Sequence, residues 1–119
     1  MYSLKVESHF SAAHNLREYK GKCEELHGHN WKVEAAMAAE TLDKTGMVMD
    51  FTHIKAELKK IMEILDHKYI NNLPYFKEVN PTSENIAKYI HDNLKAALPG
   101  LISVTVWESE RSSATYEET

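Results

Sequence analysis

The sequence has only one cysteine among its 119 residues, Cys23. A lone cysteine cannot form a disulfide within the chain, which excludes a small disulfide-stabilised scaffold. There is no apolar run of the roughly 18 residues that a membrane-spanning helix needs. The stretch MYSLKVESHF at the start has no basic segment followed by an apolar one, so we expect no signal peptide. These absences predict a cytoplasmic protein with a free thiol and no membrane partner.

Positive charge is also scarce. The chain has 14 lysines and arginines against 18 acidic residues, a net charge of −4. Without a basic stripe, the sequence predicts no binding to nucleic acid. Internal repeats and flexible linkers are absent as well, and 43% of the residues are hydrophobic. Length and composition therefore predict one domain, residues 1–119, with a substantial core.

The hydrophobic pattern changes its period along the chain. It predicts strands at 2–10, 29–40, 101–108 and 114–116, and helices at 54–65 and about 82–98. Asp50 or Thr52 is expected to cap the first helix, and Pro99-Gly100 to stop the second. The order predicts an α+β fold: an antiparallel four-stranded sheet with both helices on one face. Its two free edges favour pairing with other subunits.

The stretch CEELHGHN contains two histidines, His27 and His29, at the start of the second predicted strand. Residues two apart in a strand point to the same side, so both rings face one point. Paired imidazoles suit zinc, which at catalytic sites takes three protein ligands and a water. The alternative is a solvated or hydrogen-bonded pair of histidines without a metal.

The third ligand is either Cys23 or His14. Coordination would deprotonate and occupy the thiol, which then could not act as a base. His14 follows the first strand, and antiparallel pairing of the first two strands would bring it beside His27 and His29. This pairing predicts a three-histidine site and leaves Cys23 free.

Two acidic residues have a possible role in chemistry. Asp66 directly precedes His67 at the end of the first helix. The pair is either a helix cap or a base oriented by a carboxylate. Glu108 falls in phase with Ile102, Val104 and Val106, which are expected to face the core, so it either lies at a solvated strand end or meets a specific hydrogen-bond donor.

The stretch NPTSEN, residues 80–85, reads first as a helix start with Asn80 or Thr82 as its cap. Its free N–H groups and Glu84 are also suited to a polar heterocycle. Three further histidines, His9, His53 and His91, are expected to be solvated.

Five motifs occur in order: FSAAH, CEELHGHNW, LDHKYIN, NPTSEN and VWES. Together they resemble the 6-pyruvoyltetrahydropterin synthase and 6-carboxytetrahydropterin synthase family, from end to end of the chain. The spacing C-x3-H-G-H is similar to that of the carboxy-type enzymes of queuosine biosynthesis. A cysteine at position 23, where some relatives have glutamate, argues against the branch that releases 6-hydroxymethyldihydropterin.

The resemblance implies zinc on His14, His27 and His29. It implies that Cys23 is a proton acceptor, assisted by Asp66 and His67. Glu108 would anchor the pterin ring, with Thr82, Ser83 and Glu84 nearby.

The implied substrate is 7,8-dihydroneopterin triphosphate. The implied products are 6-carboxy-5,6,7,8-tetrahydropterin, acetaldehyde and triphosphate. The implied architecture is the tunnelling fold, in which trimers close a barrel and two trimers stack as a homohexamer with sites between subunits. Two alternatives stay open: a pyruvoyl-type synthase, and a non-catalytic module whose zinc site is closed by Cys23.

Overall fold

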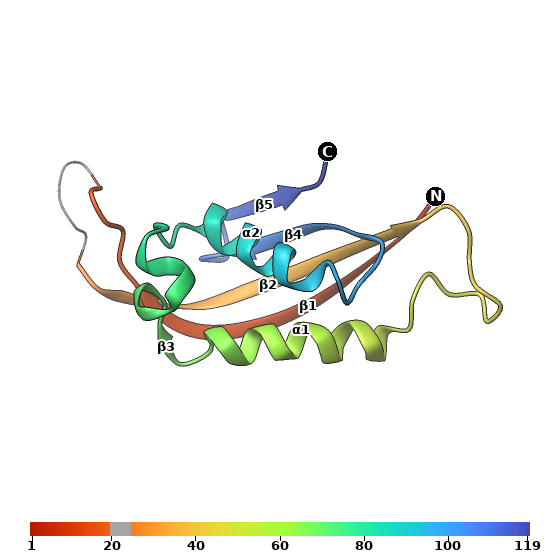
Figure 1. Cartoon of the computed structure of the whole chain (residues 1–119), viewed down its shortest axis with the longest axis horizontal. Helices are drawn as coiled ribbons and strands as arrows, with labels where there is room; N and C mark the ends of the chain where they lie inside the picture. Colours follow the sequence, from red (N-terminus) through yellow and green to blue (C-terminus); the bar gives the residue numbers. More distant parts are fainter. Residues whose placement is uncertain (20–24) are drawn as a thin grey trace.

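The computed structural model describes residues 1–19 and 25–119, which form one sheet and two α-helices (Figure 1). Along the chain the elements are β1 (Tyr2–His14), β2 (His27–Ala39), α1 (Phe51–Leu65), β3 (Lys68–Tyr69), the 3-10 turns η1 (Ile70–Asn72) and η2 (Pro74–Lys77), α2 (Ser83–Leu94), β4 (Leu101–Trp107) and β5 (Ser113–Glu117). All four predicted strands and both predicted helices are present, and β1 runs four residues further than expected.

The sheet has five strands within the described ranges, in the order β3-β1-β2-β4-β5. The pairs β1–β2, β2–β4 and β4–β5 are antiparallel, whereas β3 pairs with β1 in parallel. The prediction of four antiparallel strands was therefore wrong, because the sheet is mixed. The missed strand, β3, has two residues, too few for an alternating pattern to register in the sequence.

One face of the sheet packs against both helices, as predicted. α1 lies against β1, and α2 lies against β4 and β5. Inward side chains on neighbouring strands contact one another. The ring of Phe10, for example, stacks on that of Trp31, with centroids 5.6 Å apart. The core cluster that joins the strands and the helices includes Val33, Ala35, Leu58, Leu65, Ile86, Ile90, Val104 and Val106. This arrangement is the predicted α+β layering.

Capping residues set the ends of both helices. The Asp50 carboxylate accepts a hydrogen bond from the backbone N–H of Thr52 at 2.8 Å, and Thr82 caps α2 by accepting from Asn85. Of the two candidates predicted at each start, the caps are thus Asp50 rather than Thr52, and Thr82 rather than Asn80. α2 ends at Leu94, earlier than expected. The residues after it form turns, in which the N–H groups of Ala97 and Leu98 both donate to the carbonyl of Leu94.

The expectation for Ile102 was wrong. Its side chain is 41% exposed, whereas Leu101 is fully buried. The β2–β4 register shifts between Ala36 and Met37, so Leu101 and not Ile102 faces the core. Such an irregularity changes which side chains point inward and leaves no mark in the alternation of the sequence.

The expectation that His91 is solvated was also wrong. The residue is 4% exposed, because β5 and the chain after it pack over α2. Its Nδ1 lies 3.0 Å from Asp92 Oδ1, and its Nε2 lies 3.0 Å from Glu118 Oε1. His9 and His53 are exposed, as expected.

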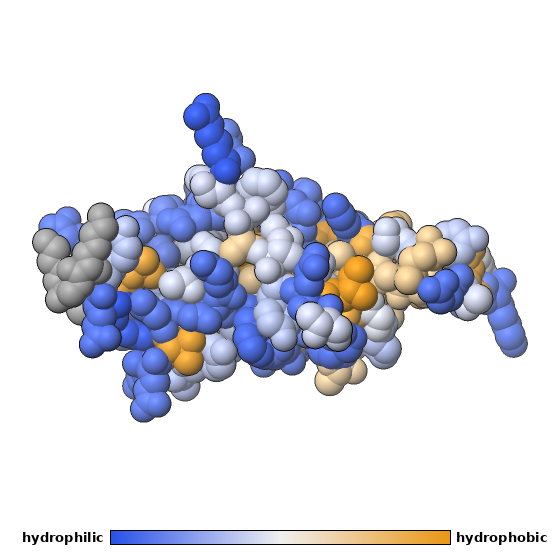
Figure 2. All heavy atoms as spheres, turned by 90° about the horizontal axis from the view of Figure 1, so that it is seen from above, coloured by the Kyte–Doolittle hydropathy of each residue, from blue (hydrophilic) through white to orange (hydrophobic). Residues whose placement is uncertain are grey.

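The surface seen from above is largely hydrophilic, and its hydrophobic side chains gather mainly in the right-hand part of the view (Figure 2). Among the described residues, no helix combines the length and apolarity that crossing a membrane requires.

Candidate metal centre

The β1–β2 hairpin brings three histidines together. His14 pairs directly with His27, and Ala12 pairs with His29. Because β1 continues through His14, this residue lies inside the ladder rather than after it. Side chains on paired positions share one face of a sheet, so all three imidazoles point to the helix-covered side. The juxtaposition of the three histidines therefore follows from strand register.

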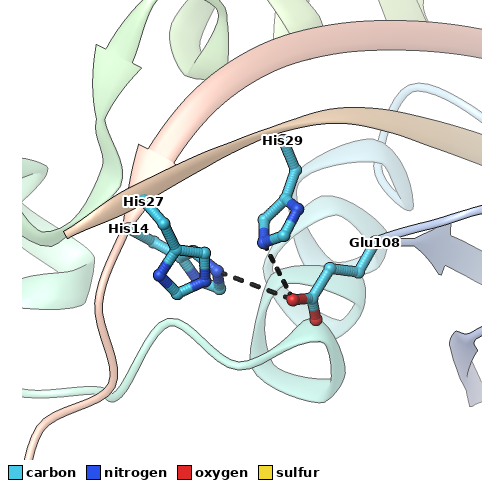
Figure 3. A group of neighbouring side chains, drawn as sticks. All are labelled: His14, His27, His29 and Glu108. Atoms are coloured by element: carbon cyan, nitrogen blue, oxygen red, sulfur yellow. Dashed lines mark ion pairs between the residues drawn. The ribbon is translucent and has the colours of Figure 1, made fainter. Parts of the chain in front are cut away.

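The three rings form one compact group (Figure 3). The centroid of His14 lies 4.7 Å from that of His27 and 5.3 Å from that of His29. The Glu108 carboxylate faces them from the end of β4. One donor atom from each of the four residues lies within 4.8 Å of the others. The group has the size of a site for a single metal ion.

Backbone carbonyls fix two of these rings. His14 Nδ1 lies 2.8 Å from the carbonyl oxygen of Pro81, and His27 Nδ1 lies 2.9 Å from that of Glu25. A carbonyl only accepts, so Nδ1 of each ring carries a proton, and in the neutral ring Nε2 then carries the lone pair. This is the arrangement in which metal-ligating histidines are normally held.

Two ring nitrogens in this group are buried without a hydrogen bond among the described residues: Nε2 of His14 and Nε2 of His29. Burial also lowers the pKa of His14 below its ordinary value, and the nearby His27 and His29 add to this shift. The neutral ring is the form that binds metal. Buried imidazole lone pairs beside a carboxylate fit a metal ion, and this donor set suits zinc.

Glu108 links the histidines to the start of α2. Its Oε1 lies 2.9 Å from His29 Nε2 and 4.0 Å from His14 Nε2, although the approach to His29 lacks hydrogen-bond geometry. Its Oε2 accepts a hydrogen bond from the Ser83 hydroxyl at 3.3 Å. Glu108 is therefore turned inward, in the phase that the sequence indicated.

A cavity of about 440 Å³ opens beside this carboxylate. It is lined by His14, Leu16, Arg17, Glu18, Tyr19, Asn80, Thr82, Ser83, Glu84 and Glu108. The three predicted contact residues Thr82, Ser83 and Glu84 thus lie together with Glu108 around one space. Helix α2 begins at this wall, with Ser83 and Glu84 in its first turn.

Asp66 and His67 form a pair at the edge of the sheet. Asp66 Oδ2 lies 2.9 Å from His67 Nδ1, and Oδ1 accepts from the backbone N–H of Ser11 at 2.8 Å. The hydrogen bond from Ser11 is the main cause of the lowered pKa of Asp66, so this carboxyl stays ionised at neutral pH. The His67 side chain is 82% exposed, and neither residue is among those described as lining the cavity.

Cys23 lies outside the described residues, so its position relative to the histidines and to His67 stays a prediction. The contact of Glu108 with His29 was missed by sequence reasoning, which placed this carboxylate at the substrate alone. The available signal was the position of Glu108 in the alternating pattern of its strand, which places its side chain on the inward face. The carbonyl of Pro81, 67 positions from His14, left no signal in the sequence.

Comparisons with known proteins identify the family of the chain. The sequence model of the family described as 6-pyruvoyl tetrahydropterin synthase matches residues 3–119. A 6-carboxy-5,6,7,8-tetrahydropterin synthase from Synechocystis is 41% identical, with 98% of this chain and 93% of the relative covered. The human 6-pyruvoyl tetrahydrobiopterin synthase is 40% identical over 87% of this chain and 74% of the relative.

The fold also resembles that of a solved member of this family. The solved 6-pyruvoyl tetrahydropterin synthase of Caenorhabditis elegans superposes with a TM-score of 0.87, at 26% identity, and covers 99% of this chain and 96% of that one. With the family's sequence pattern and its fold both present along the length of the chain, the protein belongs to the 6-pyruvoyl tetrahydropterin synthase family of pterin synthases.

Proposed function

We propose that the protein is a zinc-dependent 6-carboxytetrahydropterin synthase. It converts 7,8-dihydroneopterin triphosphate and water into 6-carboxy-5,6,7,8-tetrahydropterin, acetaldehyde and triphosphate, as a step of queuosine (7-deazaguanine) biosynthesis. The observation that carries the proposal is the group of three histidines and Glu108 beside the cavity, in a chain of this family. The extensive match to the Synechocystis carboxy-type relative supports the choice of product.

The metal would be held by Nε2 of His14, His27 and His29. Zinc, when bound, supplies a Lewis acid that acidifies the C–H bond beside a coordinated hydroxyl. The chain itself supplies the three imidazoles, which the β1–β2 hairpin brings together. His14 and His27 are held by the carbonyls of Pro81 and Glu25, so little ordering is needed when the site fills.

Proton transfer is assigned to Cys23, with Asp66 and His67 in support. A thiol near cationic groups has a lowered pKa and offers a useful thiolate fraction at neutral pH. Asp66 receives the Ser11 N–H through one oxygen and holds the His67 ring with the other. This arrangement keeps His67 oriented, as a base supported by a carboxylate requires.

The pterin is assigned to the cavity beside Glu108. A carboxylate accepts two parallel hydrogen bonds from adjacent N–H groups, and the pterin ring presents such a pair. Thr82, Ser83 and Glu84 supply polar groups along the same wall, and Ser83 already holds one oxygen of Glu108. Glu108 would thereby fix the ring relative to the metal.

There are two alternatives to this proposal, a synthase with another product and a metal site without catalysis. The similarity to the human relative, whose name denotes a 6-pyruvoyl product, leaves a pyruvoyl-type synthase as the runner-up. The proximity of Glu108 to His29 favours, as a second class, a closed structural site in which the carboxylate occupies the fourth position. A closed site predicts a bound metal without turnover.

The same proposal includes the assembly and the location. Both outer strands, β3 and β5, have one neighbour each in the described sheet, and unpaired strand edges favour pairing with another copy. We propose a homohexamer of two trimers, in which the sheets of each trimer close a barrel and one domain of residues 1–119 forms each subunit. The proposed compartment is the cytoplasm.

Two variants separate metal binding from proton transfer. His14→Ala removes one ring nitrogen from the group and should lose most of the zinc. Cys23→Ala should keep its zinc and its fold but lose turnover, because alanine accepts no proton. Metal analysis, circular dichroism and turnover of the purified variants provide the measurements. Loss of zinc from Cys23→Ala would instead identify Cys23 as a metal ligand and contradict its assignment as the proton acceptor.

A further inference from the structure

Two asparagines that the proposed reaction does not use hold the end of β1. Asn71 accepts a hydrogen bond from the backbone N–H of Asn15 at 3.0 Å and donates to the carbonyl of the same residue at 2.8 Å. Asn80 does the same with Arg17, at 2.8 Å and 3.1 Å. Each side-chain amide thus makes the reciprocal pair of hydrogen bonds that a neighbouring antiparallel strand would make. We call Asn71 and Asn80 the amide clamps.

The amide clamps flank the hydrogen bond that orients His14. Asn15, held by Asn71, follows His14 directly. Asn80 directly precedes Pro81, whose carbonyl accepts from His14 Nδ1 at 2.8 Å. The direction of the His14 ring therefore depends on how residues 71–81 are fixed against the end of β1.

Further hydrogen bonds keep this segment in place. The Asn80 carbonyl accepts from the Asn85 side chain at 2.9 Å, which ties it to the first turn of α2. The Arg17 guanidinium donates to the carbonyls of Phe76 and Val79. The clamps thus belong to one network that joins β1, the η2 turn and the start of α2.

The chemistry of the clamps requires an amide. Each must donate at one end and accept at the other, and an ionised carboxylate of the same shape only accepts. Asn71 is 7% exposed, so water replaces few of its hydrogen bonds if one partner is lost. A change from asparagine to aspartate therefore removes the hydrogen bond that the side chain donates. It also places a carboxylate oxygen next to the backbone carbonyl oxygen that accepted this bond.

We propose that Asn71 and Asn80 are positioning residues of the metal centre. By fixing Asn15 and Pro81 they hold His14 Nε2 in the direction of His27 and His29. This inference rests on the proposed metal centre. Groups that orient metal-ligating histidines typically contribute about 10- to 100-fold to metal affinity.

The test compares Asn80→Asp and Asn71→Asp with a matched control, Asn93→Asp. Asn93 lies on an exposed part of α2 and donates only a local hydrogen bond to the Tyr89 carbonyl. Zinc affinity is measured by competition with a chelator, and Co²⁺ replaces zinc to report ligand geometry through its visible absorption. Each clamp variant should bind zinc about 10- to 100-fold more weakly, with an altered Co²⁺ spectrum, whereas Asn93→Asp should match the wild type.

Wild-type zinc affinity and Co²⁺ spectra in folded clamp variants would overturn the positioning role, even if their melting temperatures fell. Should the buried Asn71→Asp fail to fold, Asn80→Asp and the milder Asn80→Ser at the half-buried position decide the question. His14→Ala in the same assay separates the two proposals. If His14→Ala keeps wild-type zinc affinity, the metal centre itself is rejected. If His14→Ala loses zinc affinity while the clamp variants keep it, only the positioning role of the clamps is rejected.

Discussion

At the scale of single residues, the site depends on which nitrogen of each imidazole is free. Carbonyls at Pro81 and Glu25 hold the Nδ1 atoms of His14 and His27, so both rings offer Nε2. The shared side of His27 and His29 was predictable, because it follows from a spacing of two in a strand. The Pro81 carbonyl was not, since it comes from a residue remote in sequence and only the fold brings it near.

Glu108 could serve as the pterin anchor or as a metal ligand, and the two roles predict different effects of substitution. As the pterin anchor, it accepts two hydrogen bonds, each contributing about 1.5–3 kcal/mol. Glu108→Gln replaces one acceptor with a donor that faces an N–H of the ligand. We expect pterin affinity to fall about 30- to 1,000-fold, a loss of about 2–4 kcal/mol, while zinc content stays unchanged. Titration with a pterin and metal analysis provide the two measurements.

The matched control is Glu110→Gln, an exposed carboxylate two positions further along. It should leave both the affinity and the metal content at wild-type values. If Glu108→Gln loses zinc, the carboxylate is a metal ligand, in line with its 2.9 Å distance from His29 Nε2. If pterin affinity is unaffected, the anchor must be sought at Glu84.

At the scale of elements, α2 and the chain after β5 are joined by a polar group around Glu118. The carboxylate lies 3.0 Å from His91 Nε2 and 2.9 Å from Lys95 Nζ. The hydrogen bond from Lys95 is the main cause that holds the pKa of Glu118 below its ordinary value of 4.5. The group thereby connects residues of α2 to the end of the chain, 27 positions beyond His91.

The lowered pKa of Glu118 determines how its contribution to stability changes with pH. A carboxyl whose pKa is lower in the folded state stabilises the fold above its unfolded pKa, and the stabilisation is lost as the pH falls through the folded pKa. We expect Glu118→Gln to lower the melting temperature at pH 6–7, with the difference from wild type disappearing at pH values well below 4.5. Thermal unfolding followed by circular dichroism across this range provides the measurement.

Glu117→Gln, at an exposed position of β5, serves as the control and should follow the wild type at every pH. Equal melting temperatures of Glu118→Gln and wild type at neutral pH would contradict the account of this polar group.

The elements differ in how far their sequence patterns could specify them. α1 and α2 have a clear helical period and capping residues, so the sequence limited each cap to two candidates, which included Asp50 and Thr82. β3 is too short to have a period, and the register shift opposite Leu101 depends on how β4 meets β2. His91 was predicted to be solvated because its partner Glu118 lies 27 positions further along the chain and leaves no signal near His91 in the sequence.

At the scale of the whole molecule, the arrangement of the site depends on contacts between distant segments. The hairpin supplies His14, His27 and His29, β4 leads to Glu108, and α2 supplies Ser83. Motifs in order along the sequence predicted that these segments meet. They could not predict the four-donor group, because the distance from Glu108 to His29 depends on packing across the sheet.

The central claim is that this constellation makes a carboxy-type pterin synthase, and one measurement tests it most directly. The zinc-loaded protein is incubated with 7,8-dihydroneopterin triphosphate, and pterin products and acetaldehyde are quantified together. The account predicts 6-carboxy-5,6,7,8-tetrahydropterin and acetaldehyde in equal amounts, with triphosphate. A 6-pyruvoyl product without acetaldehyde, or no turnover by protein that holds its full complement of zinc, would contradict it.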